Sequence, residues 1–131
     1  MTESLLARLN DEEARKADRS RDILLFTKEG YSIFVGRNSE ANDALLSQHN
    51  HPRCIWLHIE EGGGSHVVLC VEGLKDPGDA ILRFAASLAK RFSKSESTKI
   101  RYSFLENVFK PVGCGIGIWK SRMPTILDLK E

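Results

Sequence analysis

The chain has 131 residues, of which 41% are hydrophobic and 28% charged, and its formal net charge is +1. This is the length of one domain with a single hydrophobic core. Because no apolar stretch approaches the roughly 20 residues that cross a bilayer, and the charged N-terminus has no signal-peptide core, we expect a cytoplasmic protein that does not contact membranes.

The first predicted element is a helix over residues 2–18, which Thr2 can cap. Beyond Leu9 the run DEEARKADRSR carries mixed charges at helical spacing, which favours a solvated helix, with contact to a partner protein as the alternative. We therefore predict a charged helical extension over residues 1–20 and a folded domain over residues 22–131.

A β-hairpin is predicted next. The runs ILLFT and YSIFV flank Lys28-Glu29-Gly30, a sequence that predicts a type I turn with Gly30 in the left-handed conformation. A short helix follows, capped at Asn38-Ser39 and running to about His49, with Leu45 and Leu46 on its buried side.

The stretch CIWLHIEEGGGSHVVLC, residues 54–70, has two apolar runs around a glycine-rich turn, and each run carries one histidine. Alternation along the strands places Trp56, His58 and His66 on one face. We predict a pairing with residue 57 opposite 69, because a one-residue slip would bury His66 among aliphatic side chains. Three interpretations stay open: a metal or acid–base site, a polar surface for a ligand, or two histidines at a strand edge.

The longest predicted helix runs from about residue 77 to 94 and begins at Pro77. One flank is apolar, and the other is basic. The surrounding segment 83–110 holds seven basic and two acidic side chains, an asymmetry that is typical of nucleic-acid contact. Its basic residues are Arg83, Lys90, Arg91, Lys94, Lys99, Arg101 and Lys110.

Three strands are predicted after this helix, at about 99–105, 116–119 and 125–129, with a glycine-punctuated loop at 110–115. The order of elements predicts an α+β fold. We expect a single domain with a largely antiparallel, mixed sheet of hairpins and two or three helices packed on one side of it.

Two segments could bind phosphate. The GGGSH turn could cradle it through backbone amides, although a flexible turn explains the sequence equally well. At Arg37-Asn38-Ser39 the free N–H groups and dipole of a helix start favour anions. Trp56 or Tyr102, if exposed, could stack an unpaired base; the alternative is that each belongs to the core. No tight ligand cluster such as HxH, HExxH or CxxC is present, so we predict no metal site.

Four segments in order resemble a known family: GYSIFVGRNSEAND (30–43), CIWLHIEEGGGSHVVL (54–69), FAASLAKRFSKS (84–95) and IRYSFLENVFKPVG (100–113). They are similar to the motifs of the NFACT-R domain, the RNA-binding module of the NEMF/RqcH (fibronectin-binding protein A-like) ribosome quality-control proteins. The resemblance covers about residues 22–129. It implies a module that contacts RNA, notably tRNA in a ribosome-bound complex, without a cofactor or a reaction.

The resemblance also implies which positions bind. The positions carried over are Gly36, Arg37, Asn38, Asn42, Asp43, Trp56, His58, Gly64, Ser65, His66, Lys110, Pro111 and Gly113. Together with the basic helix, the predicted nucleic-acid contacts are Arg37, Asn38, Asn42, Asp43, Trp56, His58, Ser65, His66, Arg83, Lys90, Arg91, Lys94 and Lys110. No catalytic residue is predicted.

The leading hypothesis is a stand-alone, non-enzymatic NFACT-R-like module that binds tRNA or ribosomal RNA in ribosome quality control or translation. One alternative is an accessory protein or thiol-dependent enzyme of tRNA modification, using Cys54, Cys70 or Cys114; their odd number and the lack of a CxxC pair favour reduced thiols. A second alternative is an adaptor that contacts the ribosome or a partner protein through residues 2–18.

Overall fold

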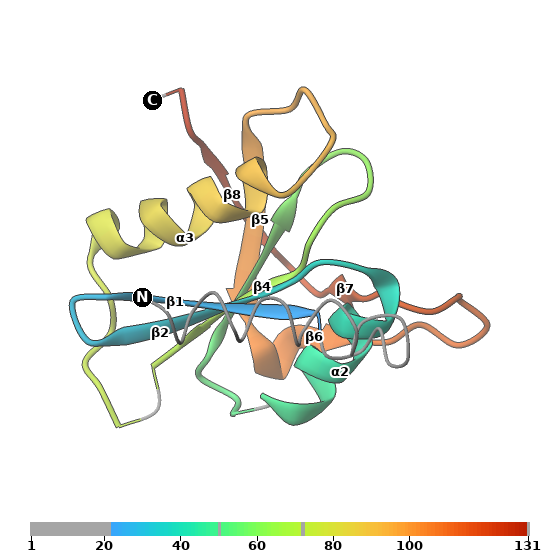
Figure 1. Ribbon diagram of the computed structural model, residues 1–131, viewed down its shortest axis with the longest axis horizontal. Helices are drawn as coiled ribbons and strands as arrows, with labels where there is room; N and C mark the ends of the chain where they lie inside the picture. Colours follow the sequence, from blue (N-terminus) through green and yellow to red (C-terminus); the bar gives the residue numbers. More distant parts are fainter. Residues whose placement is uncertain (1–21, 50, 72, 131) are drawn as a thin grey trace, which may run out of the picture.

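The computed structural model describes residues 22–49, 51–71 and 73–130 (Figure 1). The predicted N-terminal helix and the domain boundary near residue 20 lie outside these residues. Within the described ranges, no helix combines the length and apolar character that a membrane span requires.

The fold is α+β, as predicted, and is built on an antiparallel sheet with the strand order β1-β2-β4-β3-β5-β8. The strands of this sheet are β1 Ile23–Lys28, β2 Tyr31–Gly36, β3 Ile55–Ile59, β4 Val67–Cys70, β5 Lys99–Phe104 and β8 Thr125–Asp128. The other elements are helices α2 Ser39–Gln48 and α3 Asp79–Arg91, the 3-10 helix η2 Leu105–Asn107, and the paired short strands β6 Val108–Phe109 and β7 Lys120–Ser121.

The two helices cover opposite faces of the sheet, so the expectation that helices pack on one side is wrong (Figure 1). Leu57 of β3 belongs to the core that α3 closes with Ile81 and Leu88. Its neighbour Trp56 points to the other face and packs in a second core with Leu45 of α2. The central strands are therefore buried on both sides, and Trp56 is only 1% exposed.

The hairpin of β1 and β2 turns through Glu29 and Gly30, which have φ angles of 50° and 86°. Lys28 pairs directly with Tyr31, so the loop has two residues. Two positive φ angles in a two-residue loop define a type I′ turn, whose twist matches that of the strands. The predicted type I turn is wrong, whereas the left-handed conformation of Gly30 is confirmed.

Strands β3 and β4 pair two residues away from the predicted register, with Leu57 opposite Val67. The difference arises because the residues after β3 leave the sheet, and Gly64 forms an isolated bridge with Ser93, just beyond α3. A shift of two residues keeps every side chain on its face. His58 and His66 therefore share a face, as predicted, and their ring centroids are 4.7 Å apart.

The predicted strand at 116–119 is wrong, because these residues form a turn and loop that lead into β7. Gly117 explains why: its φ is 79°, and a Cβ there would lie 2.7 Å from the Cα of Ser39. The alternation of IGIW imitates a strand, but the glycine marks a close approach to the first turn of α2.

Gly36, at the end of β2, lies so close to Asn42 that a side chain at this position should destabilise the fold. A Cβ at this position would lie 2.3 Å from Oδ1 of Asn42 and 3.1 Å from its backbone. We expect G36A to lower the free energy of unfolding by about 1–3 kcal/mol through overpacking, measured by urea denaturation. The matched control is G63A, which meets no atom within 4 Å and should change stability by less than about 1 kcal/mol. Equal effects of the two substitutions would contradict the close approach.

Candidate nucleic-acid interface

A pocket of about 410 Å³ lies where three segments meet: the start of α2, the glycine-rich turn and the chain beyond α3. We call it the Arg37 pocket. It is lined by Arg37, Asn38, Ser39, Asn42, Gly63, Gly64, Ser65, Phe92 and Lys94. The fold thus brings together both segments that the sequence indicated as phosphate-binding candidates, and five of the predicted contact residues line one pocket.

The charge of the Arg37 pocket is positive. Arg37 and Lys94 line it, and no lining residue carries a carboxylate. Nε of Arg37 is 3.6 Å from a carboxylate oxygen of Asp22, while 37% of the Arg37 side chain stays exposed. Lys94 is exposed beyond the end of α3. Two cations that approach one cavity from separate segments favour an anionic ligand.

The start of α2 adds hydrogen-bond donors to this pocket. Asn38 is the N-cap, with an extended backbone, and its side chain accepts a hydrogen bond from the N–H of Ala41. This cap satisfies one of the first-turn N–H groups that have no partner inside the helix. Ser39 lines the pocket at this helix end, where the helix dipole adds partial positive charge.

Asn42 also lines this pocket, and its amide has a defined orientation. Its side chain is only 6% exposed, and its Oδ1 accepts a hydrogen bond from the backbone N–H of His66 at 3.1 Å. That bond fixes the orientation of the amide, because an N–H can donate only to the oxygen. Nδ2 is therefore the atom of this amide that could donate to an acceptor in the pocket.

His66 is buried and hydrogen-bonded at both ring nitrogens. Nε1 of Trp56 donates to Nδ1 of His66 at 2.8 Å, and Nε2 of His66 lies 3.0 Å from the carbonyl of Gly117. Since the indole can only donate, the imidazole carries its proton on Nε2 and donates it to Gly117. Burial, together with the neighbouring His58, lowers the pKa of His66 to about 3, so the ring is neutral.

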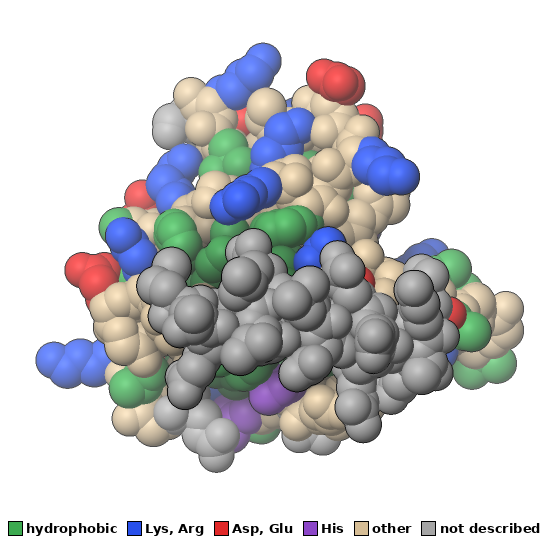
Figure 2. All heavy atoms as spheres, in the orientation of Figure 1, with side chains coloured by type: hydrophobic (Ala, Val, Ile, Leu, Met, Phe, Trp, Pro, Cys, Tyr) green, Lys and Arg blue, Asp and Glu red, His purple; other side chains and the backbone are tan. Residues whose placement is uncertain are grey.

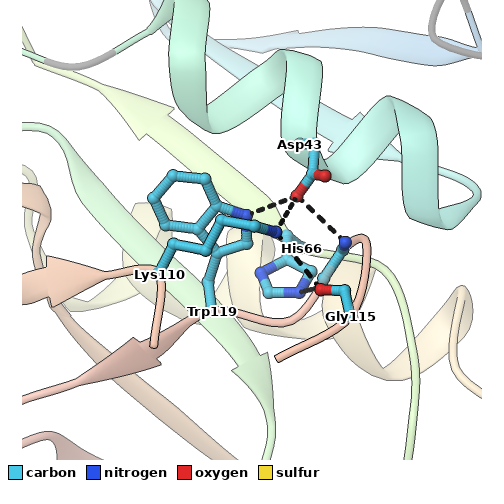
Figure 3. A network of polar contacts seen from close by, with 6 residues as sticks. Asp43, His66, Lys110, Gly115 and Trp119 are labelled. Carbon is cyan, nitrogen blue, oxygen red and sulfur yellow. Dashed lines mark hydrogen bonds and ion pairs between the residues drawn. The ribbon is translucent and has the colours of Figure 1, made fainter. Parts of the chain in front are cut away.

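Asp43 of α2 holds the loop that follows β6 (Figure 3). Its Oδ1 accepts hydrogen bonds from Nζ of Lys110 at 2.9 Å, the N–H of Gly117 at 2.9 Å and Nε1 of Trp119 at 2.8 Å. Burial opposes ionisation, but these donors outweigh it and lower the pKa of Asp43. The carboxylate therefore ties residues 110–119 to α2.

His58 is half-buried beside His66 and stacks on Trp56, with the ring centroids of His58 and Trp56 5.9 Å apart. Its Nδ1 lies 2.7 Å from the carbonyl of Ile59. Burial and the positive charge of Arg101 lower the pKa of His58 in spite of that contact. Trp56, His58 and His66, which were predicted to form a polar surface for a ligand, thus pack against one another beneath the site.

This burial corrects the predicted roles of Trp56 and His66. Trp56 is 1% exposed and His66 is 3% exposed, so of the two alternatives for Trp56 the structure supports the core position and not a stacking surface. The reason is that α2 covers their face of the sheet, packing Leu45 and Leu46 against Trp56. Trp56 and His66 can therefore act on a bound ligand only indirectly, by positioning residues such as Asn42 that line the pocket.

Most of the predicted basic residues lie away from the Arg37 pocket or are engaged in other contacts. Arg83 pairs with Asp79 at 3.0 Å, and Nζ of Lys90 donates to the carbonyl of Ser95 at 2.7 Å. Arg91 lies over the ring of Phe92. Figure 2 shows Lys and Arg side chains at separate points over the α3 half of one face. Of the basic residues predicted on the long helix, only Lys94, which lies beyond the observed end of α3, is among the residues that line the pocket.

Sequence reasoning missed two aromatic residues at or near the site. Phe92 falls within the predicted long helix over residues 77–94 and was not singled out as a contact residue, yet it lines the Arg37 pocket. Trp119 was placed in the incorrect strand, whereas it donates to Asp43. The glycines on either side of Ile116 were the available signal that this segment is a loop.

The other chemical interpretations gain no support from the described residues. Among residues 22–49, 51–71 and 73–130, no three His, Cys, Asp or Glu side chains are grouped so that they could hold a metal ion. Cys54 is buried, Cys70 and Cys114 are half-buried, and all three are thiols. None of the three lines the Arg37 pocket.

Comparison with known proteins gives a consistent result. The model of the NFACT protein RNA binding domain matches residues 23–115. Rqc2 homolog RqcH of Bacillus subtilis is 30% identical over 123 residues, covering 89% of this chain and 21% of that protein. Rqc2 homolog RqcH of Streptococcus pneumoniae serotype 2 is 36% identical over 84 residues, covering 62% of this chain and 15% of that protein.

A solved structure is also similar, that of the C-terminal part of the fibronectin/fibrinogen-binding protein from Streptococcus suis. It superposes with a TM-score of 0.70 at 30% sequence identity and covers 79% of this chain and 43% of that chain. The chain spans about a fifth or less of the length of the curated relatives it matches.

The buried imidazole predicts how stability depends on pH. His66 has a pKa of about 3 in the folded protein and an ordinary value of 6.5, so the unfolded chain binds more protons between these values. The free energy of unfolding should therefore fall as the pH drops below about 6.5, and be about 1.4 kcal/mol lower at pH 5.5. Urea denaturation between pH 7.5 and 5.5 measures this. In H66Q the slope should be shallower, with His58 supplying the remainder; an unchanged slope would refute the assignment.

The Asp43 cluster predicts a difference between two aspartates. D43A leaves three donors without their shared acceptor, so we expect a loss of about 2 kcal/mol in unfolding free energy. D76A is the matched control, because the Asp76 side chain is 69% exposed and pairs with Arg53 on the surface; it should cost less than about 1 kcal/mol. Thermal denaturation of both variants decides, and equal losses would contradict the role of Asp43.

Proposed function

This chain belongs to the NFACT protein RNA-binding domain family, and from that premise we propose that it binds RNA by holding the sugar-phosphate backbone in the Arg37 pocket. The observation that carries the proposal is the meeting of Arg37 and Lys94 at the start of α2. These two side chains come from distant segments of the chain. They line one pocket together with hydrogen-bond donors of the kind that bind phosphate.

Each group of the pocket has a role in this proposal. The guanidinium of Arg37 presents a planar set of donors that suits two phosphate oxygens. Lys94, which is exposed, supplies a second charge from the segment beyond α3. Nδ2 of Asn42 and the first turn of α2 offer donors in fixed positions beside the pocket. The ring of Phe92 forms an apolar wall against which a ribose could pack.

We further propose tRNA or ribosomal RNA as the ligand, with a role in ribosome quality control or translation and no chemical reaction. The support is the similarity to proteins named Rqc2 homolog RqcH. A function in thiol chemistry is not favoured, since Cys54 is buried and the cysteines do not line the pocket. An adaptor role of residues 2–18 concerns a segment outside the described residues.

Charge reversal tests the Arg37 pocket directly. We expect R37E/K94E to weaken binding of a labelled tRNA transcript at least tenfold at low salt. Because two phosphate contacts are lost, the slope of log K against log salt concentration should shrink in magnitude by about one to two. Fluorescence anisotropy at several salt concentrations measures both quantities.

The control for this test is K28E/K75E, which makes the same change in net charge. Lys28 and Lys75 are exposed near the turn of the β1–β2 hairpin, at the end away from Arg37. There the hydroxyl of Tyr31 donates to the carbonyl of Lys75. This variant should bind tRNA nearly as well as the wild type. If both variants weaken binding equally, RNA responds to total charge alone, and the proposed site fails.

A further inference from the structure

We propose that a second pocket, formed around Trp119, binds an unpaired base of the RNA strand whose phosphate occupies the Arg37 pocket. This inference rests on the proposed function and adds to it the class of ligand, a single-stranded segment. The Trp119 pocket has a volume of about 420 Å³ and is lined by Leu46, Ser47, Leu105, Val108 and Trp119. Trp119 lies beyond residues 23–115, which the family model matches.

The lining of the Trp119 pocket has the chemistry of a slot for a flat, partly polar ring. Leu46 of α2, Leu105 of η2 and Val108 of β6 supply apolar contacts, and Trp119 supplies an aromatic wall. Ser47 is exposed at the edge and offers a hydroxyl. Mostly apolar walls with few polar groups are typical of small-ligand sites, and every base has a face that can stack on an aromatic ring.

The indole of Trp119 is held in place before any ligand arrives. Its Nε1 donates to Oδ1 of Asp43 at 2.8 Å, so one edge of the ring is fixed to α2. Nζ of Lys110 lies 5.5 Å from the ring centroid (Figure 3). A ring that is already ordered loses little conformational entropy when a base stacks on it.

A cation beside the slot favours a nucleotide over an uncharged occupant. The side chain of Lys110 is 37% exposed although it also pairs with Asp43. Its ammonium also donates to the carbonyl of Gly115 and lies beside Trp119, outside the lining itself, where it would meet the phosphate next to a stacked base. An uncharged apolar peptide segment has no group for this ammonium to pair with. Charge complementarity thus points to an unpaired nucleotide as the occupant of the Trp119 pocket.

The two pockets lie along one helix. Ser39 lines the Arg37 pocket and Ser47 lines the Trp119 pocket, and both belong to α2. At 1.5 Å per residue, they are about 12 Å apart along the helix axis. That separation is short enough for one strand to place a phosphate in the first pocket and a nearby base in the second.

The test compares two RNA probes of equal charge: a single-stranded decauridylate and an abasic ribose-phosphate decamer. Wild-type protein should bind decauridylate about tenfold more tightly, because stacking of one base contributes on the order of a tenfold gain or more. Decauridylate should also quench the fluorescence of Trp119, which the abasic decamer should leave unchanged. Trp56, the other tryptophan, is buried at 1% exposure and therefore stays out of contact with the probe.

Two substitutions separate stacking from a structural role of the ring. W119F and W119L both lose the donor to Asp43, but only W119F keeps an aromatic face. W119F should retain most of the tenfold preference for decauridylate, while W119L should bind both probes equally. Equal behaviour of the two variants would mean that the ring only holds the loop, which overturns the proposal.

The remaining outcomes distinguish this inference from the proposed function. If wild-type protein binds both probes equally and in a salt-dependent manner, backbone binding stands and the base pocket is rejected. The same result leaves the Trp119 pocket to a protein partner. If neither probe binds and charge reversal at Arg37 and Lys94 has no effect on tRNA, the proposed function fails, and the base pocket fails with it.

Discussion

The arrangement of the site depends on one buried, neutral imidazole. His66 joins three parts of the molecule: it accepts from Trp56 in the sheet, donates to Gly117 in the loop, and its backbone N–H binds Asn42 of α2. A buried polar ring is tolerated only when its nitrogens are paired, and these three bonds are met only if helix, sheet and loop keep their positions. The orientation of the Asn42 amide, and with it a donor of the Arg37 pocket, follows from that requirement.

Sequence periodicity predicted which side chains share a face, but not what covers that face. The predicted pairing of β3 with β4 was two residues from the observed one, yet His58 and His66 remained together because strand side chains repeat every two residues. Burial depended on α2, whose short apolar pattern does not specify the side of the sheet on which it packs. The partner of Nε2 in His66 lies 51 residues away in a glycine turn, and no local pattern indicates such a contact.

The excess of basic residues in one segment predicted the position of the pocket less well than the helix start and the glycine-rich turn did. Segment 83–110 carries a net excess of five basic side chains, but Lys90 is engaged by a backbone carbonyl and Arg83 by Asp79. Lys94 lines the Arg37 pocket because it lies beyond the end of α3, near the bridge between Gly64 and Ser93. The two segments predicted to bind phosphate, the GGGSH turn and the helix start at Arg37-Asn38-Ser39, both line this pocket. They were a better guide to its position than the number of basic residues in segment 83–110.

The contact between Gly117 and Ser39 has a thermodynamic consequence. A Cβ on Gly117 would lie 2.7 Å from Cα of Ser39, so the loop that carries Trp119 packs directly against the first turn of α2. A ligand that stiffens one of them also lowers the entropic cost of ordering the other. In the proposed complex, a phosphate at one end of α2 and a base at the other would therefore favour each other, and linkage would require the gain in affinity to be the same in both directions.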